Sequence, residues 1–374
     1  MSTTGDRQNV VIVGGGNGGI SVFNELSKTL DASKYDLILI TPRPFFVHLP
    51  ATIRMVMTAD GNLEDTAIMP LPEHKFNTGN KKLVLAHVTS VVDDEIKGRY
   101  VTLDNGQEIE YSVLVLAPGS QWESPLDMPD TKEEIGHMLQ SWRARFAMAQ
   151  DVVIVGGGSI GIELAGELKD LQADKSVTIV QGQTLLLNDA YPASWRKRVT
   201  DSVTARGVNV VLDDYVDDVE VKDGCVTTRS GRSIPADLVV PTRGPRPNTK
   251  FIQSLGSDVL NATGYVKVSP TLQLVSHPRI FAAGDVIDWK EQKQSAKVAG
   301  HASVVSNNVL VLLGQKKKMV NYKGAFEAIL ITNGNYGGIA YIDILWGIVL
   351  GNWLVSLIKS RGLLVNMVKW MLKL

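Results

Sequence analysis

The chain has 374 residues, of which 44% are hydrophobic and 21% are charged, and its 38 basic residues balance its 39 acidic ones. This length predicts two or three domains, and the balanced charge gives no reason to expect nucleic-acid binding through bulk electrostatics. The single cysteine, Cys225, excludes an intrachain disulfide framework and a redox-active cysteine pair.

The N-terminal residues 1–8 are polar and lack the apolar stretch that a secretory signal requires. Ser2 follows Met1, whereas N-myristoylation requires glycine at that position. Together with the lone cysteine, these features predict a cytoplasmic protein in a reducing compartment that is not secreted.

Two segments of nearly the same form are the strongest signal in the sequence. Residues 10–26 read VVIVGGGNGGISVFNEL, and residues 152–168 read VVIVGGGSIGIELAGEL. Each has a continuous apolar run, typical of a parallel strand buried on both faces, followed by a glycine cluster and a helical pattern. Their separation is far too long for a solenoid. The two copies therefore predict two similar βαβ domains.

The predicted elements follow these two copies along the chain. The first copy predicts strand 10–13, a helix near 18–30 and strand 37–40. The second predicts strand 152–155, a helix near 160–171 and strand 177–180. Further short strands are predicted at 83–92, 99–103, 114–116, 208–212, 216–221, 226–228, 238–240, 325–331 and 338–342. Two segments rich in Pro, Gly and polar residues, 117–130 and 241–248, are typical of crossovers between domains.

Each glycine cluster has the spacing of a loop that binds a pyrophosphate. The first glycine permits a tight turn, the second lets the ligand approach the backbone, and the third lets helix and strand pack closely. The helix N-terminus then offers free N–H groups to the phosphates. The alternative for either copy is a purely structural turn. The six positions are Gly14, Gly16, Gly19, Gly156, Gly158 and Gly161.

An acidic ribose ligand is expected at the end of the second strand of each unit, and both units lack it. The first unit has Thr41, which still offers a hydroxyl to a ribose, and the second has the neutral Gln181. This pattern leaves NADH and NADPH as open alternatives. Arg196 or Arg198 could supply a cation for a 2′-phosphate, although both fit better on a solvated helix face.

At this point the chain resembles the flavoproteins with two dinucleotide-binding domains and a glutathione-reductase-like fold. The resemblance rests on the two glycine loops together with LAPGS at 116–120 and IFAAGD at 280–285. It implies an α/β protein whose residues 1–120 and 245–315 form a Rossmann-like FAD domain and whose residues 121–244 form a Rossmann-like NAD(P)H domain. Residues 316–374 would form a small C-terminal α+β domain. Asp285 would bind the ribityl chain of FAD.

Within this group the chain is similar to the apoptosis-inducing-factor-like family, and to its ferroptosis suppressor protein branch. The segments FVH at 46–48, IR at 53–54, RGV at 206–208 and KSR at 359–361 carry this similarity. Such proteins reduce quinones with NAD(P)H at a membrane surface. The chain departs from the family in lacking the N-terminal glycine, which argues against a lipid anchor, and in carrying Thr41, which implies a weaker ribose contact to FAD.

The resemblance also implies roles for individual residues. Glu163 would position the nicotinamide, with compensation of the helix dipole as the alternative. Lys359 would lie near the isoalloxazine, with an interfacial lysine as the alternative. His301 is a candidate proton donor, although a packed or capping histidine fits better, and His48 should run beside the flavin. The remaining implied cofactor contacts are Arg54, Ala117, Gly119, Gly244, Gly284 and Lys297.

The C-terminal tail has the character of an interfacial segment. Its apolar run at 346–358 has 13 residues, too short for a span of about 20. Beyond it, Gly362, Asn366, Lys369 and Lys373 fall on one helical face, and apolar residues fill the rest. We expect residues 346–374 to lie on an intracellular membrane, at the outer mitochondrial surface or on a lipid droplet. A core-facing helix and a homodimer contact are the alternatives.

These observations predict an FAD-dependent NAD(P)H:quinone oxidoreductase. The lone Cys225 disfavours disulfide reduction and sulfide:quinone chemistry, and no Cys/His cluster has the spacing of a metal site. The alternatives are a reductase of a protein electron carrier and a redox-sensing signalling flavoprotein with slow turnover.

Overall fold

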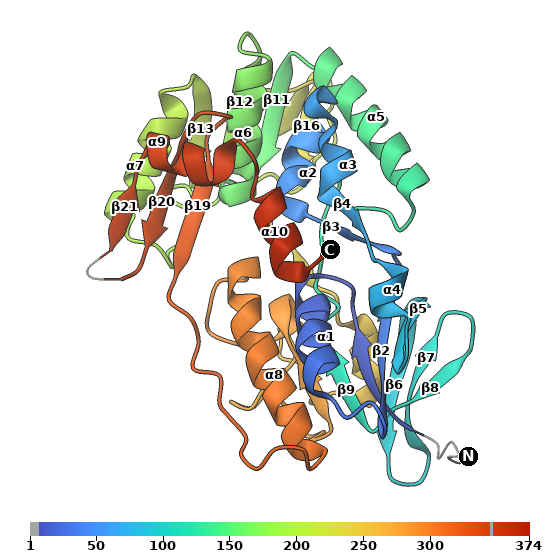
Figure 1. The fold of residues 1–374 in the computed structure, drawn as a ribbon. Helices are drawn as coiled ribbons and strands as arrows, with labels where there is room; N and C mark the ends of the chain where they lie inside the picture. The colour runs from blue at the N-terminus through green and yellow to red at the C-terminus, as the bar shows by residue number, and fades with distance from the viewer. Residues whose placement is uncertain (1–6, 345–346) are drawn as a thin grey trace.

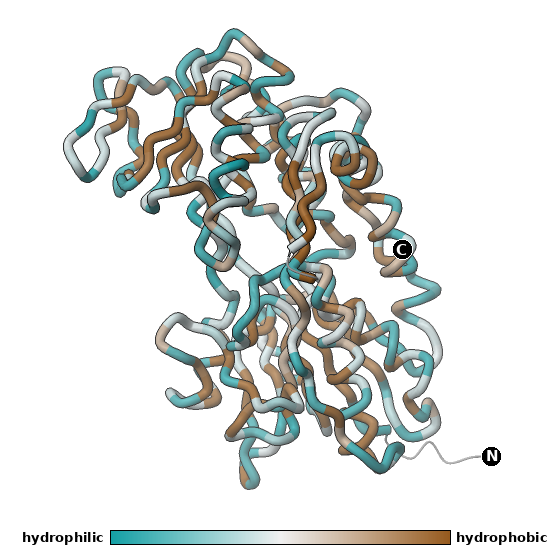
Figure 2. The backbone as a smooth tube through the Cα atoms, turned by 90° about the vertical axis from the view of Figure 1, so that its left-hand side faces the viewer, coloured by the Kyte–Doolittle hydropathy of each residue, from teal (hydrophilic) through white to brown (hydrophobic). Residues whose placement is uncertain are grey.

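The computed structural model describes residues 7–344 and 347–374, and it folds into two lobes that the C-terminal elements bridge (Figure 1). Predictions that concern residues 1–6, including Ser2, and residue 346 lie outside the described residues. The most apolar segments run through the interior of both lobes, and polar segments lie at the loops (Figure 2). The predicted α/β class is confirmed.

The lower lobe is built on a five-stranded parallel sheet of order β18-β9-β1-β2-β5. Its strands are nearly fully buried at the centre, where Val10, Val11 and Ile12 are 0% exposed. Helices α1 and α8 pack against each other on this sheet. The bounds are β1 (Gln8–Val13), α1 (Asn17–Thr29), β2 (Tyr35–Thr41), β5 (Lys81–Leu85), β9 (Val113–Leu116), β18 (Ile280–Ala282) and α8 (Val298–Leu312).

An antiparallel meander completes this lobe, and of the short elements along the chain here, α2 and α3 lie beside the upper lobe (Figure 1). The predicted single strand 83–92 is wrong, because the chain turns at Ala86 and His87 and the apolar run is divided between two different sheets. The meander comprises β6 (Val88–Asp94), β7 (Gly98–Leu103) and β8 (Glu108–Glu110). The short elements are β3 (Phe45–Val47), α2 (Leu49–Met55), α3 (Leu63–Ala67), β4 (Ile68–Pro70), α4 (Glu73–Phe76) and the 3-10 turns Asp60–Asn62, Lys250–Leu255, Gly284–Val286 and Ser295–Lys297.

The upper lobe repeats the design with a four-stranded parallel sheet of order β13-β12-β11-β16. Its helices are α5 (Lys132–Met148), α6 (Ser159–Leu171) and α7 (Ala193–Thr204), and its strands are β11 (Asp151–Val155), β12 (Ser176–Gln181), β13 (Val208–Leu212) and β16 (Leu238–Pro241). A hairpin of β14 (Cys225–Thr227) and β15 (Ser233–Pro235) lies beside them. The two crossover segments pair with each other through β10 (Ser120–Gln121) and β17 (Arg246–Pro247).

The predicted strand 216–221 is wrong. These residues pair with no strand of the described chain, yet Val216 is 2% exposed, and Val219 and Val221 pack against the same apolar cluster. The alternating pattern therefore arises from side-chain burial along an extended segment, which does not require a ladder of backbone hydrogen bonds.

The C-terminal part forms the three-stranded antiparallel sheet β19 (Ala328–Thr332), β20 (Gly338–Ile342) and β21 (Ile348–Leu350), followed by α9 (Asn352–Val355), a π-helical turn (Ser356–Ser360) and α10 (Val365–Leu372). Helix α10 returns to the lower lobe, where Asn24 Nδ2 and Lys75 Nζ donate to Leu372 O over 2.9 and 2.7 Å. None of the helices among residues 7–344 and 347–374 is long and apolar enough to cross a membrane.

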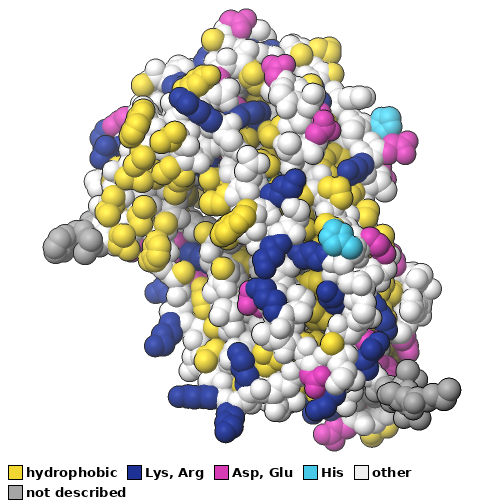
Figure 3. All heavy atoms as spheres, in the orientation of Figure 1, with side chains coloured by type: hydrophobic (Ala, Val, Ile, Leu, Met, Phe, Trp, Pro, Cys, Tyr) yellow, Lys and Arg dark blue, Asp and Glu magenta, His cyan; other side chains and the backbone are white. Residues whose placement is uncertain are grey.

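Helix α10 is shorter than the sequence predicts, because Leu363 and Leu364 adopt left-handed conformations. Its inner face packs through Val365, Val368 and Leu372. The outward apolar residues gather with those of α9 and the π-helical turn on one face of the molecule (Figure 3). This C-terminal apolar patch comprises Trp353, Leu357, Ile358, Met367, Trp370 and Met371, which are 43–79% exposed.

Candidate functional site

The first glycine loop has the geometry that a bound pyrophosphate needs. Gly14 has φ +113°, and a Cβ there would lie 2.1 Å from Ala117 O. A Cβ at Gly19 would lie 1.8 Å from Gly14 O, so both positions require glycine for packing. A Cβ at Gly16 would meet nothing within 4 Å. Gly16 thus faces open space at the uncapped N-terminus of α1, where free N–H groups can receive phosphates.

A cavity of about 520 Å³ opens at this loop, and we call it the first cavity. Thr41 lines it and is 4% exposed, so its hydroxyl is the polar group at the expected ribose position. Ala117, Gly119 and Ser120 of the first crossover form another part of the wall. The cavity therefore brings together the predicted residues of the first unit.

Sequence reasoning missed a charged cluster on the wall of the first cavity. Arg43 Nε donates to Asp130 Oδ1 over 2.8 Å, and the same guanidinium donates to Met128 O. His87 Nε2 contacts Asp130 Oδ2 at 2.9 Å. The one sequence feature that could have indicated this cluster is the position of Arg43, two residues after Thr41. Asp130 comes from the far end of the first crossover segment, so its approach to Arg43 leaves no local pattern.

The second glycine loop repeats the geometry of the first. Gly156 has φ +119°, and a Cβ there would lie 2.5 Å from Thr242 O, while a Cβ at Gly161 would lie 2.1 Å from Gly156 O. A Cβ at Gly158 would meet nothing within 4 Å. A second cavity of about 580 Å³ opens at this loop. Packed side chains do not close the turn, which disfavours a purely structural role.

The second cavity extends from the upper lobe to the lower one. Its lining has three parts. The glycine loop contributes Gly156, Gly158, Ser159 and Ile160, and the ends of the strands contribute Gln181, Tyr215, Asp217 and Gly244. The lower lobe contributes Asp285, Lys293 and Gln294. Asp285 follows β18 in the turn at Gly284, which has φ +80°. Ser120 Oγ of the first cavity donates to Asp285 Oδ2 over 2.8 Å. This hydrogen bond joins the walls of the two cavities.

Glu163 and Lys359, which are far apart in the sequence, meet at the junction of α6 with the C-terminal sheet, outside the linings of the two cavities. Lys359 Nζ donates to Glu163 Oε1 over 2.5 Å and to Leu330 O over 2.8 Å. Thr332 N donates to the same carboxylate oxygen over 2.9 Å. Glu163 is 4% exposed. The pair therefore connects α6, β19 and the π-helical turn in a largely water-excluded setting.

Arg54 lies beside this junction and outside the linings of the two cavities. Its Nη2 and Nε donate to Glu167 Oε1 and Oε2 over 2.6 and 2.9 Å, and Nη2 also donates to Ser360 O over 2.8 Å. Such a buried bidentate pair fixes geometry strongly. In the structure Arg54 thus clamps α2, α6 and the C-terminal part together, and its contact to a cofactor stays a prediction.

His301 lies directly behind the Gly284 turn. Gly284 N donates to His301 Nδ1 over 3.1 Å, so Nε2 carries the ring proton and donates to Glu291 Oε1 over 2.9 Å. Tyr322 donates its hydroxyl to Glu291 Oε2 over 2.8 Å. Burial raises the pKa of Glu291, but these two hydrogen bonds outweigh it and lower the pKa. With both nitrogens engaged, His301 positions the turn that carries Asp285, as the alternative of a packed histidine implies.

Two other residues that the resemblance singles out are also engaged within the protein. Lys297 is 5% exposed and its Nζ donates to Glu327 Oε1 over 2.6 Å. His48 is 2% exposed and its Nε2 donates to Leu363 O over 2.6 Å, while burial lowers its pKa. His48 therefore ties α2 to the segment before α10.

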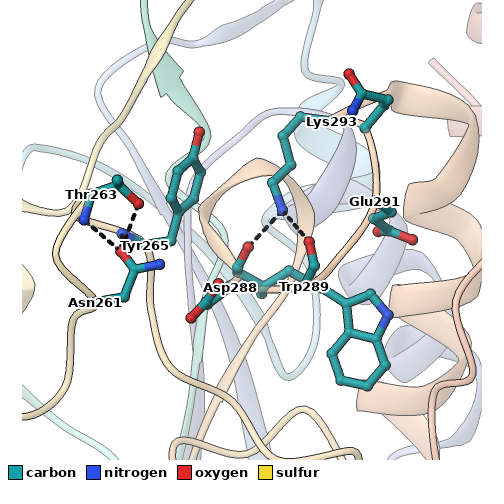
Figure 4. Close-up of a pocket in the computed structure, with 9 residues that line it drawn as sticks. Asn261, Thr263, Tyr265, Asp288, Trp289, Glu291 and Lys293 are labelled. Atoms are coloured by element: carbon teal, nitrogen blue, oxygen red, sulfur yellow. Dashed lines mark hydrogen bonds between the residues drawn. The ribbon is translucent and has the colours of Figure 1, made fainter. Parts of the chain in front are cut away.

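A third cavity of about 300 Å³ is lined by residues of the loop that follows Asp285 (Figure 4). Tyr265 and Lys293 line both this cavity and the second one. Lys293 Nζ donates to Ile287 O and Trp289 O over 2.7 and 3.3 Å and lies 5.1 Å from the centre of the Tyr265 ring. Burial lowers the pKa of Lys293. The Lys293 ammonium therefore holds in place the wall that the second and third cavities share.

The groups near the expected second ribose position differ from the sequence prediction. Gln181 Oε1 accepts from Gly157 N over 2.9 Å, and its Nε2 donates to Leu187 O over 3.2 Å. The prediction that Arg196 lies on a solvated face is wrong. Arg196 is 6% exposed, because its guanidinium is turned inward onto backbone carbonyls and the Gln183 side chain. Arg198 is exposed as expected.

Comparison with known proteins agrees with this geometry. A family model described as pyridine nucleotide-disulphide oxidoreductase matches residues 8–303. The chain is 44% identical to the FAD-dependent oxidoreductase FVFD30 of Flammulina velutipes, over 83% of this chain and 97% of that protein. It is 27% identical to ferroptosis suppressor protein 1 of Taeniopygia guttata, over 96% and 94% of the two chains. The predicted family resemblance is thereby confirmed.

Among solved structures, the fold is similar to that of the sulfide:quinone oxidoreductase from Aquifex aeolicus. The TM-score is 0.81 at 18% identity, and the match covers 98% of this chain and 91% of the other. At this identity the likeness concerns the fold alone, and it confirms the predicted architecture of two Rossmann-like domains.

Proposed function

The chain belongs to the pyridine nucleotide-disulphide oxidoreductase family, and from this premise we propose that it is an FAD-dependent NAD(P)H:quinone oxidoreductase that works at a membrane surface. Its cofactors are FAD and NAD(P)H. The overall reaction is NAD(P)H plus one proton plus quinone, giving NAD(P)⁺ and quinol. The observation that carries the proposal is the pair of glycine-lined cavities whose walls meet at the hydrogen bond between Ser120 and Asp285.

The residues present fit both cofactors. The N-termini of α1 and α6 would receive one pyrophosphate each, beside the open positions Gly16 and Gly158. Asp285 would accept from a hydroxyl of the ribityl chain. FAD, when bound, supplies the two-electron chemistry that links the nicotinamide to the acceptor. The protein contributes orientation and the exclusion of water.

A quinone suits this chain better than a disulfide does. The single thiol, Cys225, lies in the β14–β15 hairpin and has no second cysteine with which to form a dithiol. Quinones need electrons and protons but no protein thiol. Long-chain quinones also reside in lipid, which fits the exposed C-terminal apolar patch.

We place the acceptor near Glu163 and Lys359. An ammonium has three donor hydrogens, and two of those on Lys359 are directed at Glu163 and Leu330 O. The third would donate to a quinone oxygen as negative charge develops there. The contacts to Glu163 and Leu330 O orient the ammonium.

We expect Lys359→Met to lower turnover with a short-chain quinone by about 100-fold, the scale of a lost proton donor. The loss with ferricyanide, which accepts electrons without protons, should be much smaller. Steady-state assays with both acceptors measure the difference, and Lys97→Met, an exposed lysine in the β6–β7 turn, is the matched control. Equal losses with the two acceptors would argue against a role at the quinone. Rapid turnover with a protein electron carrier, and none with any quinone, would contradict the proposed function itself.

The membrane contact is proposed from the C-terminal apolar patch. Two of its members, Trp353 and Trp370, are 77% and 79% exposed, and tryptophan is enriched where proteins meet the bilayer interface. Lys369 and Lys373 are exposed on the same helix, and Lys75 lies close enough to Lys373 for their charges to interact. An apolar surface flanked by lysines is complementary to an anionic bilayer.

Replacing both Trp353 and Trp370 by serine should reduce co-sedimentation with vesicles that contain anionic lipid by at least about tenfold, because the two main interfacial anchors are lost. Ile96→Ser is the control, since Ile96 is 97% exposed on a distant turn. Binding that is unchanged in the double variant would refute the contact. Self-association of the wild type that disappears in the double variant would assign the patch to a homodimer instead.

A further inference from the structure

We propose that the second cavity selects NADH over NADPH, because Asp214 and Asp217 line its adenosine end and the two arginines beside them, Arg229 and Arg243, are each paired with a carboxylate. The inference rests on the proposed function, since it concerns the nucleotide that this cavity would hold. It goes further in naming the cofactor and the side chains, Asp214, Asp217 and Arg229, that discriminate.

The adenosine end of the cavity is fixed by the order of the strands. In this fold the adenosine ribose lies at the carboxyl end of the second strand, here β12, which ends at Gln181. The loops after β12 and β13 are joined, because Asp213 N donates to Gln183 O over 3.2 Å and Asp214 N donates to Gln181 O over 3.3 Å. Residues 214–217 therefore flank the ribose position, and they line the cavity.

Tyr215 closes this end of the cavity. A Cβ at Gly182 would lie 2.1 Å from the Tyr215 ring, so the ring rests on the backbone of Gly182. Arg229 stacks on the same ring, with its guanidinium carbon 4.4 Å from the ring centre. The ring holds the loop after β13 against the end of β12, which brings Asp214 and Asp217 to the ribose side of the cavity.

Gln181 itself recognises neither nucleotide. Both ends of its amide are used within the protein, in the contacts to Gly157 N and Leu187 O. The acidic residues beside it are Asp214, whose carboxylate also accepts from Tyr215 N and Ser230, and Asp217, whose carboxylate also accepts from Arg229. A carboxylate accepts from ribose hydroxyls and repels a 2′-phosphate, which carries a charge of about −1.5 to −2 at neutral pH.

Both carboxylates are ionised at neutral pH. Hydrogen bonds from Ser230 and Thr228 lower the pKa of Asp214 to about 2. The hydrogen bond from Arg229 lowers the pKa of Asp217 below its ordinary value. The adenosine end thus carries two carboxylate charges and one guanidinium charge, a net charge of −1, across the pH range in which such an enzyme is assayed.

Four cations in or beside this cavity already have partners within the protein. Arg229 Nη2 and Nε donate to Asp217 over 2.6 and 2.9 Å. Arg243 Nη2 and Nε donate to Glu123 over 2.5 and 3.0 Å. Arg196 donates to backbone carbonyls. Lys293 donates to Ile287 O in the wall shared with the third cavity, at the other end of the second cavity. A 2′-phosphate could recruit Arg229 only by drawing it away from Asp217.

The test is flavin reduction by NADH and by NADPH under identical low-salt conditions. For the wild type we expect kcat/KM with NADH to exceed that with NADPH by about 100-fold, the scale at which binding sites reject a poorly matched group. Asp217→Asn removes one repulsive charge and releases Arg229, so the preference should fall to about tenfold or less. Adding Arg229→Gln to Asp217→Asn should restore part of the preference, because the released cation is gone.

Asp218→Asn is the matched control. Asp218 is the adjacent residue, its carboxylate pairs with Lys222, and it does not belong to the lining of the cavity. Its preference should equal that of the wild type. Equal use of NADH and NADPH by the wild type, or an unchanged preference in Asp217→Asn, would overturn the inference while leaving the oxidoreductase proposal intact. Failure of both nucleotides to reduce the flavin would instead overturn the proposed function and the inference with it.

Discussion

Replacing Asp285 by alanine should yield a colourless protein when it is purified without added FAD. Asp285 accepts a hydrogen bond from Ser120 at the meeting point of the two cavities, and the proposed bond to the ribityl chain would be charge-assisted. Losing such a bond costs about 1.5–3 kcal/mol, which lowers FAD affinity roughly 10- to 100-fold. The ratio of visible flavin absorbance to protein absorbance measures the loss.

Asp285→Asn is the informative companion variant. The amide oxygen can still accept from Ser120, so the turn is kept while the charge is lost. Its flavin content should lie between that of the wild type and that of Asp285→Ala. Asp60→Ala, at an exposed position in a 3-10 turn, is the control and should retain full flavin. An Asp285→Ala protein with the flavin content of the wild type would remove Asp285 from the site.

Replacing Gly158 by alanine should abolish reduction by the nicotinamide while sparing the bound flavin. A Cβ at Gly158 meets no protein atom within 4 Å, and φ −74° suits any residue, so the variant should fold. The added methyl group occupies the space through which a pyrophosphate reaches the backbone. We expect kcat/KM for flavin reduction to fall by about 100-fold or more. A displacement of about 1 Å between the nicotinamide and the flavin is enough to lower the rate by that factor.

The matched variant is Gly16→Ala in the first loop, where a Cβ also meets nothing within 4 Å. It should lose FAD rather than reactivity toward the nicotinamide. Gly136→Ala, on helix α5 with equally open space, controls for the substitution itself. If Gly158→Ala reacts with NADH as fast as the wild type does, the Gly156 turn does not hold the nicotinamide cofactor.

The sequence was a poor guide wherever a side chain's role depends on its partner. The helical pattern around Arg196 predicts an exposed side chain. In the structure the guanidinium is buried, because it donates to the backbone carbonyls of the loop at 185–187. The family motif that contains Arg54 likewise gave no sign of its ion pair with Glu167. In both cases the sequence gives the charge of the arginine. Its hydrogen-bonding partner depends on how separate elements pack together, which the sequence pattern does not give.

The C-terminal tail shows the same limit in a different form. Its composition indicates an amphipathic segment, but a helical pattern does not say which apolar residues face the protein. The structure packs Val365, Val368 and Leu372 inward and leaves Met367, Trp370 and Met371 outward. The left-handed residues Leu363 and Leu364 set this rotation, and periodicity cannot reveal them.

The sequence by itself determined the two strand–turn–helix units, because strand, glycine spacing and helix are contiguous in each unit and leave a local pattern. It also determined the α/β class, through continuous apolar runs that only a doubly covered parallel sheet can bury. Only the tertiary structure decided that Glu163 meets Lys359, that His301 supports the Gly284 turn, and that a hydrogen bond joins the two cavities. Hydrogen bonds and ion pairs act over about 3 Å, so their partners are known only once distant segments have been brought into contact.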